Sequence, residues 1–284
     1  MPPGMMAGKN PGSLGGSMNR PTVKLVGVLA VTIATLSFQQ SSWAQAPNQS
    51  DQSITVFQYR QVPADKVAEF VYRETTYWSK VAEKAVDAKK MTLWVLLEQV
   101  GGYDLPNSPN FLFVNTVPNV DALGDIFNAA AVFPNVPLES ISTDGMSTTT
   151  SQFFLHDGGS IVEATGTVRD QDFKYVTISY HNSSDAAQFV ALERQVWAPF
   201  IKTAMDTKQT RQRGWSDASV LAPLGEHIRF NSVSYDFFPS LQAALMHWQP
   251  GGVFPAEGLA KLDKLRLNRP STSIYRVVHV VAAR

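Results

Sequence analysis

The chain has 284 residues, 24 basic and 24 acidic side chains, and no cysteine. Without cysteine, disulfides, thiolate metal ligands and cysteine nucleophiles are excluded. A formal net charge of zero argues against a nucleic-acid partner, since such proteins normally carry a basic excess. The hydrophobic content of 44% is sufficient for a core that needs no covalent cross-links.

Residues 1–46 have the pattern of a leader with a secretory signal peptide. Arg20 and Lys24 precede an apolar stretch from Leu25 to Phe38, and Ala44-Gln45-Ala46 supplies a small-x-small cleavage site. The apolar stretch is shorter than the ~20 residues that a membrane span needs. We therefore expect cleavage near Ala46, no membrane span afterwards, and export to the periplasm or the extracellular space. An uncleaved membrane anchor is the alternative.

The remainder of the chain carries the same pattern twice. Glu74 lies four residues before Trp78 and Glu193 lies four residues before Trp197, a shift of 193 − 74 = 119 residues. Further matches pair Tyr59 with Tyr180, Trp94 with Trp215, Asn115 with Asn231, and Val132-Phe133-Pro134 with Val253-Phe254-Pro255. Two long copies indicate a duplicated domain rather than a solenoid of many short units. We predict repeats at residues 53–165 and 173–284, with a linker at 166–172.

The hydrophobic periodicity predicts the same order of elements in each repeat. In the first repeat we expect strand Ile54–Arg60, a long helix from Pro63 to about Lys90, strands Thr92–Glu98 and Phe111–Val117, a short helix from Asn119 to about Ala130, and a strand within Ser151–Glu163. In the second we expect strand Tyr175–His181, a helix from Ser184 to about Gln209, strands Arg213–Leu221 and His227–Tyr235, a helix near Ser240–Trp248, an extra helix at Glu257–Arg269, and strand Ser273–Val281.

This β-α-β-β-α-β order is that of the ferredoxin-like unit. With two fused copies, the chain from Ser53 to Arg284 resembles the dimeric α+β barrel superfamily in a tandem-repeat form. The resemblance implies an α+β fold in which two ferredoxin-like repeats close into an intramolecular barrel. The superfamily includes cofactor-free monooxygenases, small-molecule isomerases and cyclases, and the haem-binding chlorite dismutases and dye peroxidases. The fold alone therefore does not select a chemistry.

Glu74 and Glu193 fall inside the apolar stripes of the two long predicted helices. A buried carboxylate needs a hydrogen-bonding partner or a raised pKa, and in the second case it is a candidate acid or base. Because two halves must keep the same packing but seldom keep identical catalysts, the repetition favours a structural role for both carboxylates.

The differences between the repeats provide the candidate site. If Phe57, Tyr59, Ile178 and Tyr180 face the helices, the alternate positions line the space between the two sheets, with an apolar wall from the first repeat and a polar wall from the second. The predicted catalytic residues are His181, Asp217, His227 and His279, and the predicted ligand-binding residues are Trp215, Arg229, Asn231 and Tyr275. A histidine could act as general base with Asp217 orienting it, while Arg229 and Asn231 could hold a carbonyl or carboxylate. An error of one residue in the register would move every one of these side chains to the other face.

Three functional interpretations follow. The first is an exported, cofactor-independent enzyme that acts on a small apolar carbonyl or phenolic compound. The second is a non-catalytic ligand-binding or structural protein of the cell envelope. The third is a haem protein with His227 or His279 as axial ligand. The spacing of histidines and carboxylates predicts no metal site and no cofactor. We expect a small-molecule ligand as partner, and a monomer or homodimer.

Overall fold

The computed structural model describes residues 53–101, 108–166, 172–250 and 254–283. The predicted leader, most of the predicted linker and Val253 of the repeated triplet lie outside the described residues. The described residues all belong to one compact unit. Within the described residues, no helix has the length and apolar character needed to cross a membrane.

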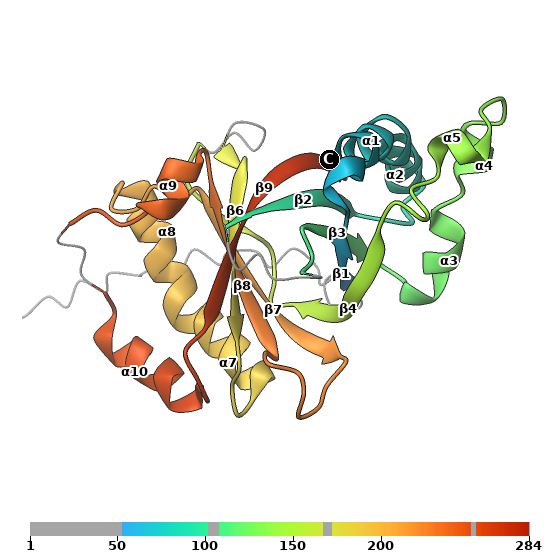
Figure 1. Ribbon diagram of the computed structural model, residues 1–284. Coiled ribbons are helices and arrows are strands. Elements are labelled where there is room, and N and C mark those ends of the chain that lie inside the picture. Colours follow the sequence, from blue (N-terminus) through green and yellow to red (C-terminus); the bar gives the residue numbers. More distant parts are fainter. Residues whose placement is uncertain (1–52, 102–107, 167–171, 251–253, 284) are drawn as a thin grey trace, which may run out of the picture. The chain divides into compact units, whose positions relative to one another are not determined.

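Eight antiparallel strands close into a barrel (Figure 1). Their order around the barrel is β4-β1-β3-β2-β9-β6-β8-β7, and β7 pairs back with β4; the short β5 adds to the outside of β7. The strands are β1 (Ile54–Gln61), β2 (Leu93–Gly101), β3 (Phe111–Val117), β4 (Thr148–Asp157), β5 (Val162–Glu163), β6 (Tyr175–His181), β7 (Gly214–Ala222), β8 (Ser232–Phe238) and β9 (Ser271–Ala282). The mixed α+β content and the antiparallel barrel agree with the predicted fold class.

The two halves of the chain contribute four strands each, in corresponding order. Strands β4-β1-β3-β2 come from the first half and β9-β6-β8-β7 from the second. The halves join at two seams, β2 with β9 and β4 with β7, so that the second strand of each half pairs with the last strand of the other. These seams are reciprocal, as in an arrangement with a pseudo-twofold axis, and they leave no open edge on the eight-stranded barrel.

One long helix in each half packs outside the barrel. In the first half α1 (Val67–Arg73), a π-helical turn (Glu74–Trp78) and α2 (Ser79–Asp87) are continuous; in the second half α7 (Ala186–Leu192), a π-helical turn (Glu193–Trp197) and α8 (Ala198–Asp206) are continuous. Each π-helical turn begins at the repeated glutamate. Shorter helices are α3 (Leu123–Ile126), α4 (Ala129–Val132), α5 (Leu138–Ile141), α9 (Leu241–Leu245) and α10 (Ala256–Leu265), with single 3₁₀ turns at Ala64–Lys66 and Val120–Ala122.

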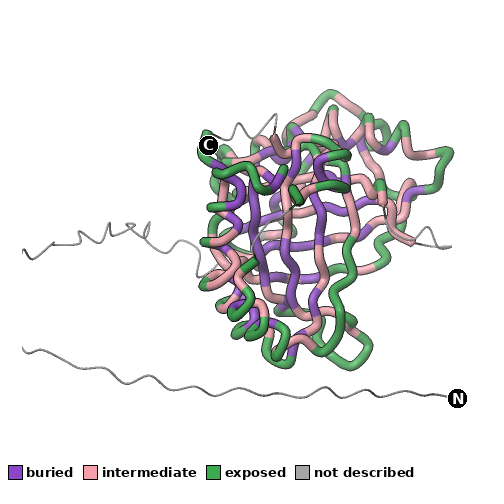
Figure 2. Tube along the Cα trace, turned by 90° about the vertical axis from the view of Figure 1, so that its left-hand side faces the viewer, coloured by how far each residue is buried: buried purple, intermediate pink, exposed green. Residues whose placement is uncertain are grey.

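The core has a layer inside the barrel and further layers beneath the helices (Figure 2). Large side chains fill the interior, including Phe57, Tyr59, Phe153, Ile178, Tyr180, Tyr235 and Tyr275. On the outer face of the first half, Trp94 and Leu96 pack under α1 and α2. On the outer face of the second half, Trp215 packs under α8 with Ile201. The inner face of the sheet and the parts of its outer face beneath the helices are therefore covered.

The predicted facing of the strands is wrong. Phe57, Tyr59, Ile178 and Tyr180 point into the barrel rather than towards the helices. The reason is that a sheet buried on both faces gives the same alternation whichever face is assigned to the interior, and a shift of one residue exchanges the faces. The polar wall of the second repeat exists, but its strand residues face α7 and the π-helical turn instead of the barrel interior.

The predicted strand His227–Tyr235 begins too early. The structure starts β8 at Ser232, so His227, Arg229 and Asn231 belong to the segment between β7 and β8. This change matters for the site, because a residue outside the strand no longer follows the inward–outward alternation from which its side-chain direction was predicted.

Candidate functional site

The predicted site residues are distributed over three places in the structure. His227, Arg229 and Tyr275 line a pocket at one end of the barrel. His181 and Asp217 lie buried beneath the helices of the second half, where Trp215 also packs. His279 packs on the outer face of the sheet against Trp94, with ring centroids 6.0 Å apart. The single site predicted from the sequence is therefore not formed.

The pocket at the barrel end, here called the barrel-mouth pocket, has a volume of about 360 Å³. It is formed where β1 and β6 end and where β4 and β9 begin, which is the same end of these antiparallel strands. Its aromatic and aliphatic lining comprises Tyr59, Phe153, Tyr180, Ile228, Phe230 and Tyr275. Gln99, Ser151, Ser271 and Ser273 add polar groups. Apolar walls with a few convergent polar groups are typical of small-molecule sites.

Three tyrosine hydroxyls form a hydrogen-bonded chain in this pocket. Tyr59 donates to the hydroxyl of Tyr180 at 3.0 Å, and the hydroxyls of Tyr180 and Tyr275 are also 3.0 Å apart. Burial raises the pKa of all three hydroxyls well above the usual value, so they stay protonated at neutral pH. The side chain of Ser273 also hydrogen-bonds to Tyr180 and Tyr275, so the chain of tyrosine hydroxyls continues to a serine that lines the pocket.

Exposed residues border the mouth of the pocket. His227 and Arg229 are exposed on the segment that precedes β8, and both line the pocket. Arg229 carries the fork of N–H donors suited to a carboxylate or carbonyl group, as the sequence predicted. Asn231 does not join them. Its side chain accepts from the backbone N–H of Ser183 at 3.0 Å and donates to the carbonyl of Ser183 at 2.6 Å, so it ties β8 to the chain after β6. Its amide is engaged within the fold, and Asn231 does not line the pocket.

The second place is a buried polar layer between the second-half sheet and the helices, consisting of His181, Glu193, Arg194, Asp217, Ser232, Ser234 and Arg266. His181 Nε2 lies 2.9 Å from Ser234 Oγ and 4.0 Å from Glu193 Oε1. Asp217 Oδ1 accepts from Arg194 Nε at 2.5 Å. The Arg194 guanidinium also lies over the Trp215 ring, 5.0 Å from its centroid. Trp215 is therefore a packing residue under the helix rather than a wall of the barrel.

Burial determines the protonation of this layer. It raises the pKa of Glu193 well above the usual value, and the nearby Asp217 carboxylate raises it further. It lowers the pKa of His181 to about 4, with an additional lowering from the Arg266 charge. Because the imidazole of His181 is neutral at neutral pH, its contact with Glu193 is not an ion pair there. Burial also raises the pKa of Asp217 to about 6, against the opposing effect of Arg194.

Five buried polar atoms of the layer make no hydrogen bond: His181 Nδ1, Glu193 Oε2, Asp217 Oδ2, Ser232 Oγ and Arg266 Nε. Seven such side-chain atoms occur in the described residues as a whole, so they are concentrated here. A buried polar group without a partner costs about 1–3 kcal/mol, and such a concentration marks a place where a polar molecule would gain hydrogen bonds.

The first-half counterpart of Glu193 has a partner. Glu74 is 4% exposed and its Oε1 accepts from Thr143 Oγ1 at 2.8 Å. Burial raises the pKa of Glu74 to about 7, and the Thr143 hydrogen bond opposes that rise. Glu193 is equally buried but has Oε2 without a partner. At the repeated position, the carboxyl of Glu74 therefore has a hydrogen-bond partner, whereas the carboxyl of Glu193 keeps one buried oxygen without a partner.

His279 and Tyr275 do not share a face, contrary to the sequence prediction. A register shift in the pairing of β9 with β2 places Val277 opposite Leu97 and His279 opposite Leu96. The extra residue in β9 is a β-bulge, which reverses the facing beyond it. Tyr275 consequently points into the barrel and His279 points away from it.

Several residues of these places were not predicted as site residues. The sequence pairs Tyr59 with Tyr180 and predicts that both pack against the helices, whereas the structure places both inside the barrel. Arg194 and Arg266 carried no signal in the sequence, because nothing in a helical arginine distinguishes a buried side chain from a solvated one. Among the described residues, no three histidine, aspartate or glutamate side chains gather as they would around a metal ion.

Comparisons with known proteins support the fold. No protein-family model matches the sequence, and no curated protein matches it. The structure is similar to that of a candidate monooxygenase from Lactobacillus acidophilus NCFM, with TM-score 0.54, 10% identity, and coverage of 82% of this chain and 97% of that one. An anthrone oxidase-like protein gives TM-score 0.50 and 16% identity over 83% and 95% of the two chains. A candidate monooxygenase from Fusobacterium nucleatum gives TM-score 0.51 and 9% identity, and the match covers 81% of this chain and 94% of that one. The chain thus has the dimeric α+β barrel fold.

Proposed function

We propose that this protein binds a small, largely apolar molecule with a carbonyl or phenolic oxygen in the barrel-mouth pocket. The observation that carries the proposal is the chain of three buried tyrosine hydroxyls in the pocket. The pocket volume of about 360 Å³ suits a molecule of one or two rings. The fold neighbours described as monooxygenase or anthrone oxidase-like proteins are consistent with a role in small-molecule chemistry.

The same geometry suits a reaction that develops negative charge on the bound oxygen. Protonated tyrosines aimed at that oxygen stabilise an enolate or phenolate. His227 at the rim is the candidate base that would accept a proton from the substrate, and Arg229 would hold an acidic substituent. This assignment gives a cofactor-independent enzyme as the first interpretation. A binding protein without chemistry is the alternative, in which the tyrosines act but substitution of His227 has no effect on the bound molecule.

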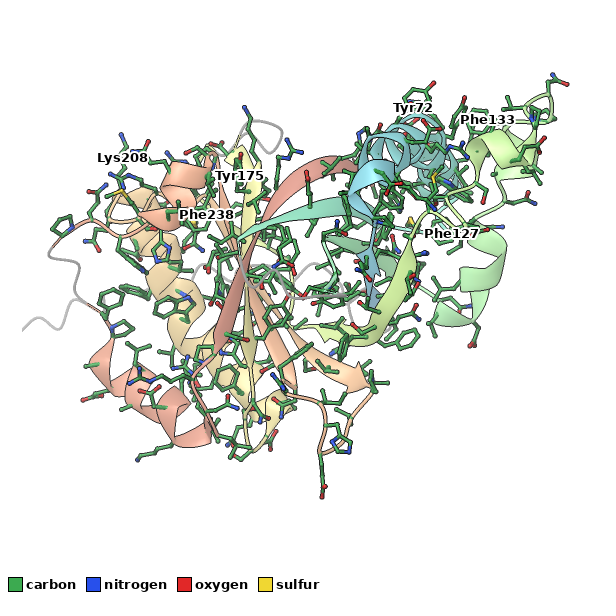
Figure 3. The ribbon with its side chains drawn as sticks, viewed as in Figure 1. Tyr72, Phe127, Phe133, Tyr175, Lys208 and Phe238 are labelled. Atoms are coloured by element: carbon green, nitrogen blue, oxygen red, sulfur yellow. The ribbon has the colours of Figure 1, made fainter. Side chains whose placement is uncertain are left out.

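The test compares 2-naphthol with naphthalene, two probes that differ by one hydroxyl group. Quenching of tryptophan fluorescence should show tighter binding of 2-naphthol by about 1 kcal/mol, or roughly fivefold in Kd, as expected for one hydrogen bond. Replacement of Tyr59, Tyr180 and Tyr275 together by phenylalanine should abolish this difference, because no tyrosine hydroxyl is then left to donate to the ligand. Tyr72→Phe is the matched control, since Tyr72 on α1 is 53% exposed and lies away from the pocket (Figure 3). Equal affinities of wild type for both probes would refute the proposal.

The buried polar layer supports a second candidate function, the retention of a polar small molecule beneath the helices of the second half. The supporting observation is the concentration of five unpartnered buried atoms. A protein expressed with its own leader should then show a native mass above its denatured mass, and Glu193→Gln should reduce that excess. Glu74→Gln is the control at the matched position of the first half. An absorption spectrum of the same sample tests the haem interpretation.

We also propose that the barrel is a tandem fusion of two ferredoxin-like units and that the protein is exported. In support of fusion, both halves have the same strand order and the seams between them are reciprocal. Residues 53–165 expressed alone should then associate into dimers, because the half barrel has two open edges. A stable monomer would contradict this.

In support of export, the sequence has the leader described above, and the mature N-terminus should be Pro47.

A further inference from the structure

A second cavity lies on the outer surface of the second half, away from the barrel-mouth pocket and from the buried polar layer. It has a volume of about 390 Å³ and lies where α8 connects to β7. Its polar lining consists of Lys208, Arg211, Arg213, Ser240, Gln242 and Gln249, together with Thr210. This cavity is called the α8–β7 groove below. The described residues that line it include three cationic side chains and no carboxylate.

The groove is built by a longer connection in the second half. The segment between α2 and β2 has five residues (88–92), whereas the segment between α8 and β7 has seven (207–213). Both begin with the same turn, since Lys89 and Lys208 adopt left-handed φ angles of 57° and 59°. The second half then adds residues before its strand, and Thr210 and Arg211 lie in this longer part.

The longer connection is fixed against the segment that follows α9. Thr210 forms an isolated β-bridge with Trp248, and the backbone N–H of Arg211 donates to the carbonyl of His247 at 2.8 Å. The Arg211 guanidinium donates to the carbonyl of Met246. Ala243, which lines the groove, belongs to the cluster with Phe238 and Tyr175 below it (Figure 3). The groove is thus a formed part of the fold rather than a gap between mobile side chains.

The two arginines of the groove have no counterpart in the first half, whereas Lys208 corresponds to Lys89. Arg213 directly precedes β7, and the corresponding residue before β2 is Thr92. Arg213 lies 3.5 Å from Asp172, which offsets part of its charge. Lys208 and Arg211 add two further positive charges at the same opening. In a protein whose formal net charge is zero, three cations around one hollow favour an anion there.

We propose that the α8–β7 groove binds a small molecule that carries a phosphate or carboxylate group. The arginine guanidinium groups present paired N–H donors that match two oxygens of such an anion, and the lysine adds a point charge. The amide groups of Gln242 and Gln249 supply neutral hydrogen bonds for the rest of the ligand. This site is separate from the barrel-mouth pocket and does not depend on the function proposed for it.

The experiment titrates the mature protein at low ionic strength with inorganic phosphate and, separately, with succinate, using isothermal calorimetry. Low salt is needed because screening weakens charge–charge attraction at an open site. We expect saturable binding of at least one anion. Lys208→Met should weaken it by about tenfold, the effect of losing one charge-assisted hydrogen bond. The substitution keeps an unbranched side chain at the left-handed position.

Lys264→Met on the exposed face of α10 is the matched control, because it removes the same charge away from the groove. Preference for phosphate assigns a phosphate ester to the site, and preference for succinate assigns a carboxylate; both support the proposal. Three results would overturn it: absence of saturable binding, unchanged binding by Lys208→Met, and equal weakening by Lys264→Met, which would reflect only the overall charge. Arg211→Gln provides a second variant at the groove, and its fold is checked by circular dichroism.

Discussion

Glu74→Gln should change how the stability of the protein depends on pH. Burial raises the pKa of Glu74 to about 7, while the unfolded chain has the ordinary value of 4.5. A raised pKa means that the stabilising effect is fully present below the unfolded value and is lost as pH rises through about 7. Each pKa unit corresponds to about 1.4 kcal/mol, so the raised pKa of Glu74 corresponds to roughly 3 kcal/mol of stability lost by alkaline pH. Because Glu74 is 4% exposed, solvent screening reduces this figure little.

Urea unfolding at a series of pH values measures the effect. The free energy of unfolding of Glu74→Gln minus that of the wild type should increase by roughly 3 kcal/mol between about pH 4 and about pH 8.5. The glutamine can still accept the hydrogen bond from Thr143, so the variant should fold. Glu226→Gln, at an exposed loop position, is the control for the loss of one carboxylate, and its difference from the wild type is measured over the same pH range. A difference for Glu74→Gln that stays constant with pH would refute the assignment of a raised pKa to this carboxyl.

Three further predictions concern the second half and the barrel interior. Arg194→Met should destabilise the protein by about 3–5 kcal/mol in urea unfolding, because it leaves the fully buried Asp217 carboxylate without its cation. Adding Asp217→Asn should recover most of that loss; failure to recover would mean that the arginine acts through packing alone. Tyr235→Phe removes a buried hydroxyl that has no hydrogen-bond partner and should leave the melting temperature unchanged or higher. Tyr180→Phe removes a hydrogen-bonded hydroxyl and should lower the free energy of unfolding by about 1 kcal/mol. A larger loss of stability for Tyr235→Phe than for Tyr180→Phe would contradict the hydrogen-bond pattern. Phe57→Ala should cost about 3–5 kcal/mol, because its ring is fully buried inside the barrel; a loss below about 1 kcal/mol would show that the interior is loosely packed.

The strand positions were predictable because their local signals are strong. Phe111–Val117 and Tyr175–His181 were predicted with the bounds that the structure has. Both segments combine β-branched and aromatic residues between turn-forming neighbours. The helix predicted from Asn119 to about Ala130 is instead divided, because the side chain of Asn128 accepts from the backbone N–H of Ala131 and starts a new helix. Such a cap competes with continuation of the helix and is not distinguished from it by hydrophobic period.

The composition of the candidate site was predicted better than its position. The second repeat does have a polar strand face, with His181 and Asp217 on it, but that face meets α7 and the π-helical turn. Alternation alone cannot show which face is interior when aromatic residues fill the barrel and helices cover its outside. The cations near this polar face are Arg194, in the π-helical turn, and Arg266, directly after α10. Only the three-dimensional structure shows that they lie close to His181 and Asp217.

Matched residues of the two repeats are not only packing residues. Tyr59 and Tyr180 are matched, and the hydroxyl of Tyr59 donates a hydrogen bond to that of Tyr180. In an arrangement with twofold symmetry, positions close to the axis contact their own counterparts. A matched pair of polar residues on the same strand of each half is therefore a candidate for such a contact, and here the contact lies in the barrel-mouth pocket. Tyr275 breaks the symmetry by adding a third hydroxyl from β9 alone, and its hydrogen bond with Tyr180 extends the pair into a chain of three.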